Sequence, residues 1–222
     1  ANLKGVNDCL SRGVDVNTIT RNGRGSQMSG WMVACAGGTP AVVSRLVQVP
    51  GLDINYQDEK YGQTAALMAS ERGQTECVRI LAETGRVDWN KANNYGYTPL
   101  FCALLSNHSD IMAIIMQQPN IDYNVKTDRC ETLGLAAVRG GDVKCVETLA
   151  AEETFDCWNV PDKHGDTAIM MALKKGKVDM VKILLRCPRV DLNCRDREGW
   201  SLVFRIIQRN EVGEKCRSVC HK

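Results

Sequence analysis

The chain has 222 residues, of which 44% are hydrophobic and 24% charged, and its formal net charge is +2. This composition is typical of a folded globular protein, and no apolar run of about 18 residues predicts a membrane span. The first residues, Ala-Asn-Leu-Lys-Gly, do not resemble a signal peptide.

One pattern recurs along the chain every 34 or 35 residues. Its first mark is an asparagine, here called the framework Asn, found at Asn55, Asn90, Asn124, Asn159 and Asn193. A hydroxyl residue suited to cap a helix recurs in step, at Ser29, Thr64, Thr98, Thr132, Thr167 and Ser201. An alanine follows five residues after it, at Ala34, Ala69, Ala103, Ala137 and Ala172.

Residues 159–193 show this pattern clearly and predict a turn, a helix, a tight bend, a second helix and a return loop. Asp162 and Gly165 frame the turn, and the hydroxyl of Thr167 should accept a free backbone N–H of the first helix. Gly176 should end that helix as a C′ glycine. Two short helices with one apolar stripe each need similar neighbours, so the pattern predicts a stack of such units.

The recurring N-x-x-D-x-x-G-x-T-P-L…A…G, followed by V-x-x-L-L, resembles the ankyrin repeat family, most clearly over residues 55–81, 90–116 and 159–185. The resemblance implies an all-α ankyrin-repeat solenoid of stacked helix-turn-helix units joined by short β-hairpin fingers. It implies a monomeric stack of roughly six repeats. The expected array covers 1–222, with a partial N-terminal repeat at 1–17, full repeats at 18–54, 55–89, 90–123, 124–158 and 159–192, and a C-terminal partial or capping repeat at 193–222.

The first stretch, residues 1–17, matches only the second half of a repeat, with Leu3, Val6 and Leu10 as its apolar stripe. Its missing first helix would leave an apolar face exposed, so we expect a segment of a longer ankyrin-repeat protein; a short natural cap is the alternative. The next loop, residues 18–28, is long, Gly-rich and basic. It lacks the Lys-Ser/Thr ending of a phosphate-binding P-loop and no strand precedes it, which favours an enlarged hairpin finger.

The fourth and sixth repeats depart from the pattern. Cys130 stands where the turn glycine is expected and Gly134 where a core leucine is expected, which predicts a distorted finger and a looser helix. An extra residue follows within 151–157. The sixth repeat loses the pattern after Ser201, and residues 213–222 are either a true C-terminal cap or a cut helix.

Eleven cysteines, an odd number, are scattered along the chain. Cys77 and Cys145 occupy the repeat position that Val42, Ile111 and Met180 hold elsewhere, so they are expected to pack as small hydrophobic residues. This favours reduced cysteines and a cytoplasmic or nuclear location over a disulfide scaffold.

Charge is unevenly distributed along the chain. Residues 1–162 carry 14 basic and 19 acidic residues, a balance of −5, whereas residues 163–222 carry 14 and 7, a balance of +7. Such asymmetry indicates either a charged partner or a solvated face of the last repeats.

Catalytic motifs are not found in the sequence, so we expect no enzyme activity and no cofactor. His108 stands next to the slot of a bend glycine, where the family resemblance implies a structural role, and His164 lies at a finger tip. Cys216, Cys220 and His221 form a C-x3-C-H group, but without a second ligand pair a metal site is not expected.

The resemblance therefore implies a protein-protein interaction scaffold that binds a protein or peptide on its concave surface, formed by the fingers and the inner faces of the first helices. The candidate partner-binding residues are Tyr61, Tyr95, Tyr97, Arg129, Lys163, His164, Lys174, Lys175, Arg197, Trp200 and Arg209. We expect the partner to be acidic because the basic residues gather in repeats four to six. Trp89, Tyr123 and Trp158 precede framework Asn residues and are expected to pack between fingers.

Two other functions are compatible with the sequence. The basic C-terminal repeats could bind nucleic acid or a nucleotide, which predicts an affinity that falls steeply with added salt. Alternatively, an aromatic cage could read methylated lysine, and its nearest candidates are Trp89, Tyr95, Tyr97 and Glu131.

Overall fold

The structure is a computed structural model that describes residues 3–21 and 27–210, with the side chains of residues 21 and 208–210 left out. The chain divides into two compact units, Ala1–Asp122 and Tyr123–Lys222. Within the described ranges, no helix is both long and apolar enough to cross a membrane.

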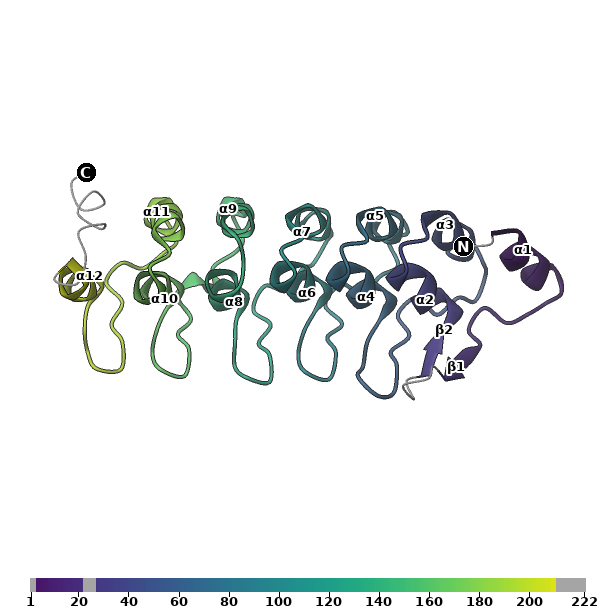
Figure 1. Cartoon of the computed structure of the whole chain (residues 1–222), viewed down its shortest axis with the longest axis horizontal. Helices are drawn as coiled ribbons and strands as arrows, with labels where there is room; N and C mark the ends of the chain where they lie inside the picture. Colours follow the sequence, from purple (N-terminus) through teal and green to yellow (C-terminus); the bar gives the residue numbers. More distant parts are fainter. Residues whose placement is uncertain (1–2, 22–26, 211–222) are drawn as a thin grey trace. The chain divides into compact units, whose positions relative to one another are not determined.

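The first unit is built from pairs of short antiparallel helices. Its first helices, α2, α4 and α6, lie side by side in one row, and its second helices, α3, α5 and α7, lie in another (Figure 1). Helix α1 packs against α3 and so continues the row of second helices. The helices are α1 (Leu3–Ser11), α2 (Gly30–Ala36), α3 (Pro40–Leu46), α4 (Ala65–Glu71), α5 (Thr75–Glu83), α6 (Pro99–Leu105) and α7 (Ser109–Met116).

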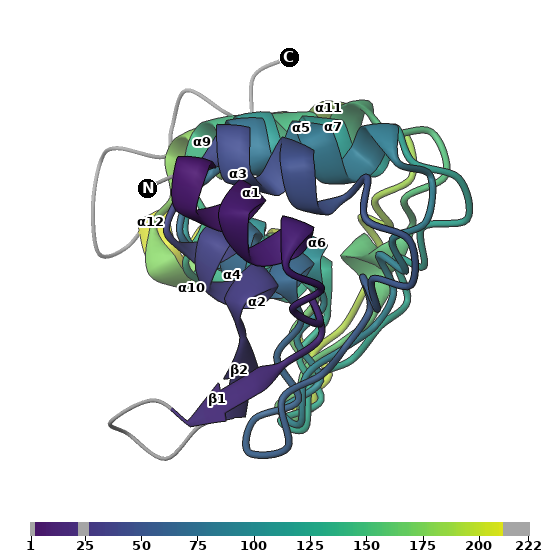
Figure 2. The same cartoon turned by 90° about the vertical axis from the view of Figure 1, so that its right-hand side faces the viewer.

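A two-stranded hairpin precedes α2. Strands β1 (Ile19–Arg21) and β2 (Gln27–Ser29) are antiparallel, with Ile19 opposite Ser29. The hairpin projects away from the helices (Figure 2). The prediction of an enlarged finger over residues 18–28 is thus confirmed for its two arms, and the turn between them lies outside the described residues.

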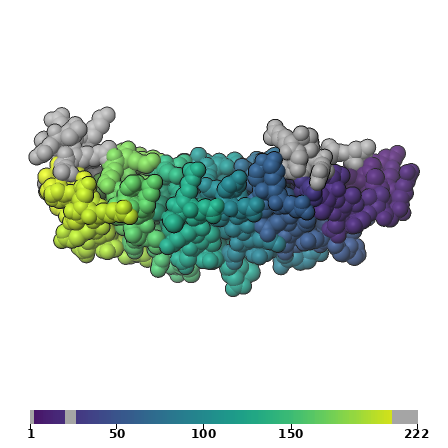
Figure 3. Space-filling model, turned by 90° about the horizontal axis from the view of Figure 1, so that it is seen from below, coloured from purple at the N-terminus to yellow at the C-terminus, as the bar shows by residue number. Residues whose placement is uncertain are grey.

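The second unit repeats the helical arrangement, and its repeats follow one another in sequence order from green to yellow in the space-filling view (Figure 3). First helices α8, α10 and α12 form one row, while α9 and α11 form the other (Figure 1). The elements are α8 (Leu133–Arg139), α9 (Val143–Ala151), the 3-10 helix η1 (Cys157–Asn159), α10 (Ala168–Lys175), α11 (Val178–Arg186) and α12 (Leu202–Asn210).

Helix α4 is buried almost all round because it lies between α2 and α6 and packs on its own second helix, α5. In α4 every residue from Ala65 to Ser70 is buried, whereas α5 buries only one stripe, formed by Cys77, Val78 and Leu81. Four of the recurring alanines have no exposed surface: Ala69, Ala103, Ala137 and Ala172. A larger side chain there would overpack the stack, at a typical cost of about 1–3 kcal/mol.

Hydroxyl side chains cap most first helices as predicted. The Oγ1 of Thr64 accepts the N–H of Leu67 at 3.1 Å, and Ser29, Thr98, Thr132 and Ser201 make the equivalent bond. The prediction is wrong for Thr167, whose hydroxyl makes no capping bond. It lies instead 3.3 Å from the thiol of Cys194, in the finger of the next repeat. Gly176 ends α10 with a φ of 72°, as predicted.

The framework Asn links each repeat to the following return loop. The side-chain amide of Asn55 donates to the carbonyl oxygen of Arg86 at 3.0 Å, and its oxygen accepts the N–H of Asp88 at 2.9 Å. Asn90 makes the same two bonds in the first unit and Asn159 makes them in the second. These paired bonds explain why asparagine recurs with the repeat period.

The fourth repeat is more regular than its sequence predicts. Cys130 adopts the left-handed φ of 58° that glycines hold at the same point of other fingers, so the turn is kept at some conformational cost. Gly134 does not loosen α8, because a Cβ at this position would lie 2.8 Å from the carbonyl oxygen of Cys157. The missing side chain makes room for η1, and the expected distortion of finger and helix is therefore wrong.

Helix α12 forms although the repeat pattern weakens after Ser201. Its apolar side chains Val203 and Ile207 are 63% and 54% exposed, whereas Ile169 and Leu173 at the equivalent positions of α10 are buried. The two readings of residues 213–222, as a cap or as a cut helix, lie outside the described residues.

Candidate interaction surface

In two fingers, the side chain three residues after the framework Asn stabilises the turn by accepting hydrogen bonds from backbone N–H groups of the same finger. The carboxylate of Asp162 accepts the N–H groups of His164 and Asp166, at 2.8 and 2.9 Å. Asn93 does the same for Tyr95 and Tyr97. Because these acceptors fix the backbone of the turn, the finger side chains project from a preorganised loop.

The three candidate tyrosines lie on adjacent fingers of the first unit. Tyr95 is 51% exposed, whereas Tyr97 is half-buried and meets Phe101 edge to face, with ring centroids 5.5 Å apart. The two fingers are joined by the N–H of Asn94, which donates to the carbonyl oxygen of Tyr61 at 3.0 Å. The ammonium of Lys60 lies 4.9 Å from the centre of the Tyr61 ring.

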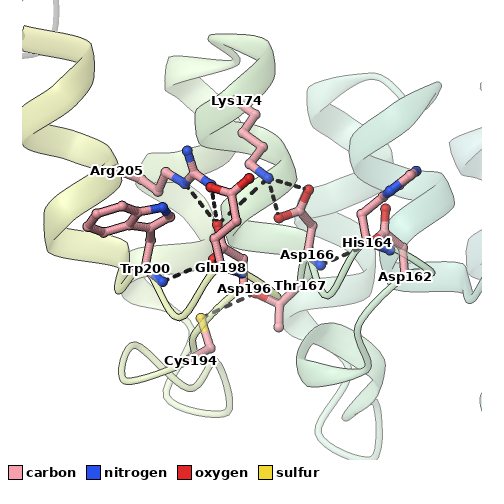
Figure 4. A network of polar contacts seen from close by, with 10 residues as sticks. All are labelled: Asp162, His164, Asp166, Thr167, Lys174, Cys194, Asp196, Glu198, Trp200 and Arg205. Carbon is pink, nitrogen blue, oxygen red and sulfur yellow. Dashed lines mark hydrogen bonds and ion pairs between the residues drawn. The ribbon is translucent and has the colours of Figure 1, made fainter.

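In the second unit, acidic and basic side chains of successive repeats form a network (Figure 4). The ammonium of Lys174 bonds both carboxylate oxygens of Asp166, at 2.6 and 2.7 Å, and lies 3.9 Å from Asp196 of the next finger. Arg205 of α12 pairs with Asp196 and, at 2.8 Å, with Glu198. Lys174 is thus already paired with carboxylates of its own chain.

Asp196 is the most deeply buried acid of this network. Burial alone would raise its pKa, but hydrogen bonds from the Arg205 guanidinium and from the backbone N–H groups of Trp200 and Glu198 outweigh that effect. The pKa of Asp196 is therefore lowered, and the carboxylate is held in its charged form. The same partnership raises the pKa of Arg205.

An ion pair of the same kind as Asp166–Lys174 lies one repeat earlier, in repeat four. Arg139 of α8 donates to the carboxylate of Glu131 at 2.6 Å, and Glu131 is only 8% exposed. Burial raises the pKa of Glu131, opposed by the positive charges of Arg139, Arg129 and Lys175. Sequence reasoning overlooked the Glu131–Arg139 and Asp166–Lys174 pairs, although each of these two acids directly precedes a threonine at a helix N-cap and lies eight residues before its base.

The remaining candidate residues differ in their environment. Arg129, Lys163, Lys175 and Arg197 are exposed and have no ion-pair partner within the described part of the chain. Trp200 stacks on Phe204, with ring centroids 3.8 Å apart, and remains 37% exposed. The side chain of Arg209 lies outside the described residues.

A pocket of about 720 Å³ lies between the fingers of repeats four and five, entirely within the second unit. It brings together three candidates, Arg129, Lys163 and His164, with the Glu131–Arg139 pair. Leu135 of α8 and Met171 of α10 supply its apolar lining. A hollow of this size accommodates a few side chains of a bound peptide.

His108 packs closely against the bend at Gly73 in the preceding repeat. A Cβ added to Gly73 would lie only 2.7 Å from the Cε1 atom of His108. Within the described ranges, no group of three or more His, Cys, Asp or Glu side chains is arranged to hold a metal ion. The C-x3-C-H group of Cys216, Cys220 and His221 lies outside those ranges.

Burial and ion pairing argue against the methyl-lysine cage. Trp89 and Trp158 are buried, as is Tyr123, which confirms the expected packing role of all three. Since Trp89 is covered and Glu131 is paired with Arg139, these two residues are unavailable for a methyl-lysine cage.

The shared repeat position of Cys77 and Cys145 is buried, as it is for Ile111 and Met180. Burial raises the pKa of Cys145 to about 12, and the neighbouring Asp142 adds to this effect. These thiols therefore pack as small apolar side chains, as predicted.

Stacked helix-turn-helix units with projecting finger loops define a helical repeat protein. Two family models, described as ankyrin repeats in three and in many copies, match residues 31–127 and 155–204. Together they cover more than half of the chain, which belongs to the ankyrin repeat family.

Two of the relatives of this chain are distant in sequence and much longer than it is. The chain is 23% identical over 153 residues to transient receptor potential cation channel subfamily A member 1 of Homo sapiens, and 26% identical over 154 residues to Rabankyrin-5 of Mus musculus. Each match covers 69% of this chain but only 13% of the relative. The crystal structure of the ankyrin repeat domain of Bcl-3 matches with a TM-score of 0.77 at 20% identity, over 91% of this chain and 86% of that one. This likeness shows the fold alone.

Proposed function

We propose that this chain is a non-catalytic scaffold that binds a protein or peptide on its finger and first-helix surface. The supporting observation is that finger residues Tyr95 and Trp200 remain 51% and 37% exposed, although the other described tryptophans are buried. Exposed aromatic side chains are frequent anchors of protein interfaces. Ankyrin repeats generally mediate protein-protein interaction and are generally non-catalytic, which agrees with this proposal.

The aromatic residues are proposed to supply most of the binding energy. Tyr61, Tyr95 and Tyr97 would form one group of anchors on the first unit, and Trp200 would form another on the second. Tyr97 and Trp200 are already braced by Phe101 and Phe204, so binding would immobilise little additional side-chain freedom. Removing either ring should weaken binding by about 2 kcal/mol, as expected for a hot spot.

Basic residues are proposed to guide an acidic partner to the second unit. Arg129, Lys163, His164, Lys175 and Arg197 are exposed there. Charges at the rim of an interface mainly increase the association rate and give specificity. Lys174 is assigned a different role, because its ammonium holds Asp166 and Asp196 together. Replacing it would perturb the fold as well as any interface.

Capture of partners by the immobilised chain tests this function. Partners retained from a cell extract, with and without nuclease, would be identified by mass spectrometry and their affinities measured by biolayer interferometry. Tyr95→Ala and Trp200→Ala should each weaken a retained protein partner. Val143→Ala is the matched control, because it shortens an exposed apolar side chain on α9, in the row of second helices.

Three outcomes would contradict the proposal. Retention that disappears with nuclease would point to nucleic acid as the ligand. Equal losses for Val143→Ala and the two aromatic variants would place the contact elsewhere or reveal a general loss of folding. No effect of either aromatic variant on any partner would remove the finger surface as the binding site.

We also propose that the protein acts as a monomer in the cytoplasm or nucleus. The support for this location is the burial of cysteines at positions that hold Val, Ile and Met in other repeats. Mass measurement before and after alkylation of the native protein should show every cysteine reduced. Two or more disulfides would overturn the assignment of compartment.

A further inference from the structure

The pocket between the fingers of repeats four and five, called here the inter-finger pocket, has an apolar wall and a charged rim. Leu135 is fully buried beneath it and Met171 is half-buried beside it. Arg129 and Lys163 stand at the rim, one on each finger. An occupant must therefore combine an apolar group with a charged one.

Two of the carboxylates lining this pocket are already engaged. Glu131 is bound by Arg139 at 2.6 Å. Asp162 accepts two backbone N–H groups of its own finger turn. The third, Asp128, is exposed at the finger tip. Engaged carboxylates have little remaining capacity to attract a cation from a partner.

The basic groups retain more of their hydrogen-bonding capacity. Arg129 and Lys163 have no ion-pair partner in the described ranges, and Lys175 is equally unpaired at the end of α10. Of the residues that line the pocket, Arg129, Arg139 and Lys163 are cations and Asp128, Glu131 and Asp162 are carboxylates, so the lining carries no net charge. Because Arg139 is paired with Glu131, Arg129 and Lys163 are the two lining cations without an ion pair in the described ranges.

The next repeat shows what the inter-finger pocket lacks. There, Lys174 bridges its own acid, Asp166, and Asp196 of the following finger. In the inter-finger pocket Arg139 binds its own acid, and the described residues include no ion pair from Arg139 to Asp162 of the following finger. An ion pair therefore connects repeat five to the finger of repeat six, whereas the described residues show no equivalent ion pair between repeat four and the finger of repeat five. The pocket lies where this second ion pair is missing.

We propose that the inter-finger pocket binds the side-chain carboxylate of an Asp or Glu residue in an acidic segment of a protein partner. The carboxylate lies between Arg129 and Lys163, and a neighbouring apolar side chain of the segment packs on the half-buried Met171. This inference rests on the proposed scaffold function and specifies one of its contacts. One carboxylate can pair with the two cations that lack an ion pair, Arg129 and Lys163, whereas a doubly charged phosphate would be repelled more strongly by the three nearby carboxylates.

A peptide titration followed by nuclear magnetic resonance tests this proposal on the full chain. The probe is acetyl-Leu-Glu-Leu-amide, added to the isotope-labelled protein. Amide signals of residues 128–131 and 162–166 should shift in a saturable way. The corresponding Gln peptide should bind about tenfold more weakly, because it lacks the charge that the two basic residues recognise.

Charge-reversal variants localise the contact. Arg129→Glu and Lys163→Glu should each weaken the Glu peptide about tenfold or more, as expected when a charge pair becomes repulsive. Arg186→Glu is the matched control: it reverses an exposed charge at the end of α11, in the row of second helices and outside the pocket. It should change the affinity less than twofold. Unchanged circular dichroism of all three variants shows that the fold is retained.

Other outcomes overturn the proposal. Equal shifts with the Glu and Gln peptides would show that charge is not recognised, and tighter binding of a phosphoserine peptide would show that the site prefers phosphate. Shifts outside both fingers would place the contact elsewhere. If a captured partner is lost on Trp200→Ala but unaffected by Arg129→Glu and Lys163→Glu, the scaffold function stands and this pocket assignment fails.

Discussion

Cys157 donates its thiol to the carbonyl oxygen of Tyr123 over 2.9 Å, and the same sulfur lies 3.4 Å from the side-chain oxygen of Asn124. At this point the repeats of Asn55, Asn90 and Asn159 bind a backbone N–H of the next return loop. The fourth repeat has an extra residue before Cys157. In this repeat the thiol of Cys157 is a donor to the framework Asn.

Cys157→Ala should destabilise the second unit by about 1–2 kcal/mol, because it removes a buried thiol together with its hydrogen bond. Urea unfolding followed by circular dichroism measures this loss. Cys130→Ser is the control, since the Cys130 side chain is exposed, and it should change the unfolding free energy by less than about 0.5 kcal/mol. Equal effects of the two variants would show that Cys157 has no special role.

Cys130→Gly should stabilise the protein by about 1 kcal/mol, because Cys130 holds a φ of 58° that glycine adopts without steric cost. Cys130→Ala separates backbone strain from side-chain loss, since alanine keeps the Cβ and should give no gain. The free energy of unfolding of both variants provides the measurement. A gain of the same size for alanine would contradict the strain argument.

The two capping threonines Thr64 and Thr167 should differ in their contribution to stability. Thr64→Ala should cost about 1 kcal/mol, because it removes an acceptor from the N-terminus of α4. Thr167→Ala should cost less, because its hydroxyl contacts Cys194 and caps no backbone N–H. Thermal unfolding of the two variants under the same conditions compares them. A larger loss for Thr167→Ala would show that its hydroxyl does cap α10 in solution.

Asp196 should make stability depend on acid pH. Its folded-state pKa is lowered, so its contribution is present above the unfolded value of about 3.9 and is lost as the pH falls through the folded value. Asp196→Asn should therefore be less stable than the parent near neutral pH, and the difference should shrink below about pH 4. Urea unfolding across this pH range measures it.

Asp179→Asn is the control for this pH dependence, because Asp179 forms an exposed ion pair with Lys182 on α11. Exposed pairs contribute little to stability, so this variant should stay close to the parent throughout the range. A constant difference between Asp196→Asn and the parent down to pH 2 would show that the carboxylate charge is not responsible.

Sequence reasoning anticipated the elements whose signals are local. The helix caps Thr64 and Thr98 and the helix-ending Gly176 each act within a few residues of the chain, so their types predict their structures. Repetition strengthened these signals, because the same marks recur with nearly constant spacing. Thr167 and Cys130 departed from what their sequence context predicted. The hydroxyl of Thr167 contacts the thiol of Cys194 in the finger of the next repeat, and Cys130 keeps the left-handed φ of the finger turn although it is not a glycine.

The sequence by itself determined the family, the helix pairs and the buried stripes, because these follow from local capping and from apolar spacing along one chain. Tertiary structure alone decided which charges face a partner. Lys174 and Lys175 are adjacent and chemically alike, yet Lys174 is bound by Asp166 and Asp196 while Lys175 is unpaired among the described residues. The physical reason is that an ion pair depends on distance in space, and stacking brings Asp196 within 3.9 Å of a lysine in the preceding repeat.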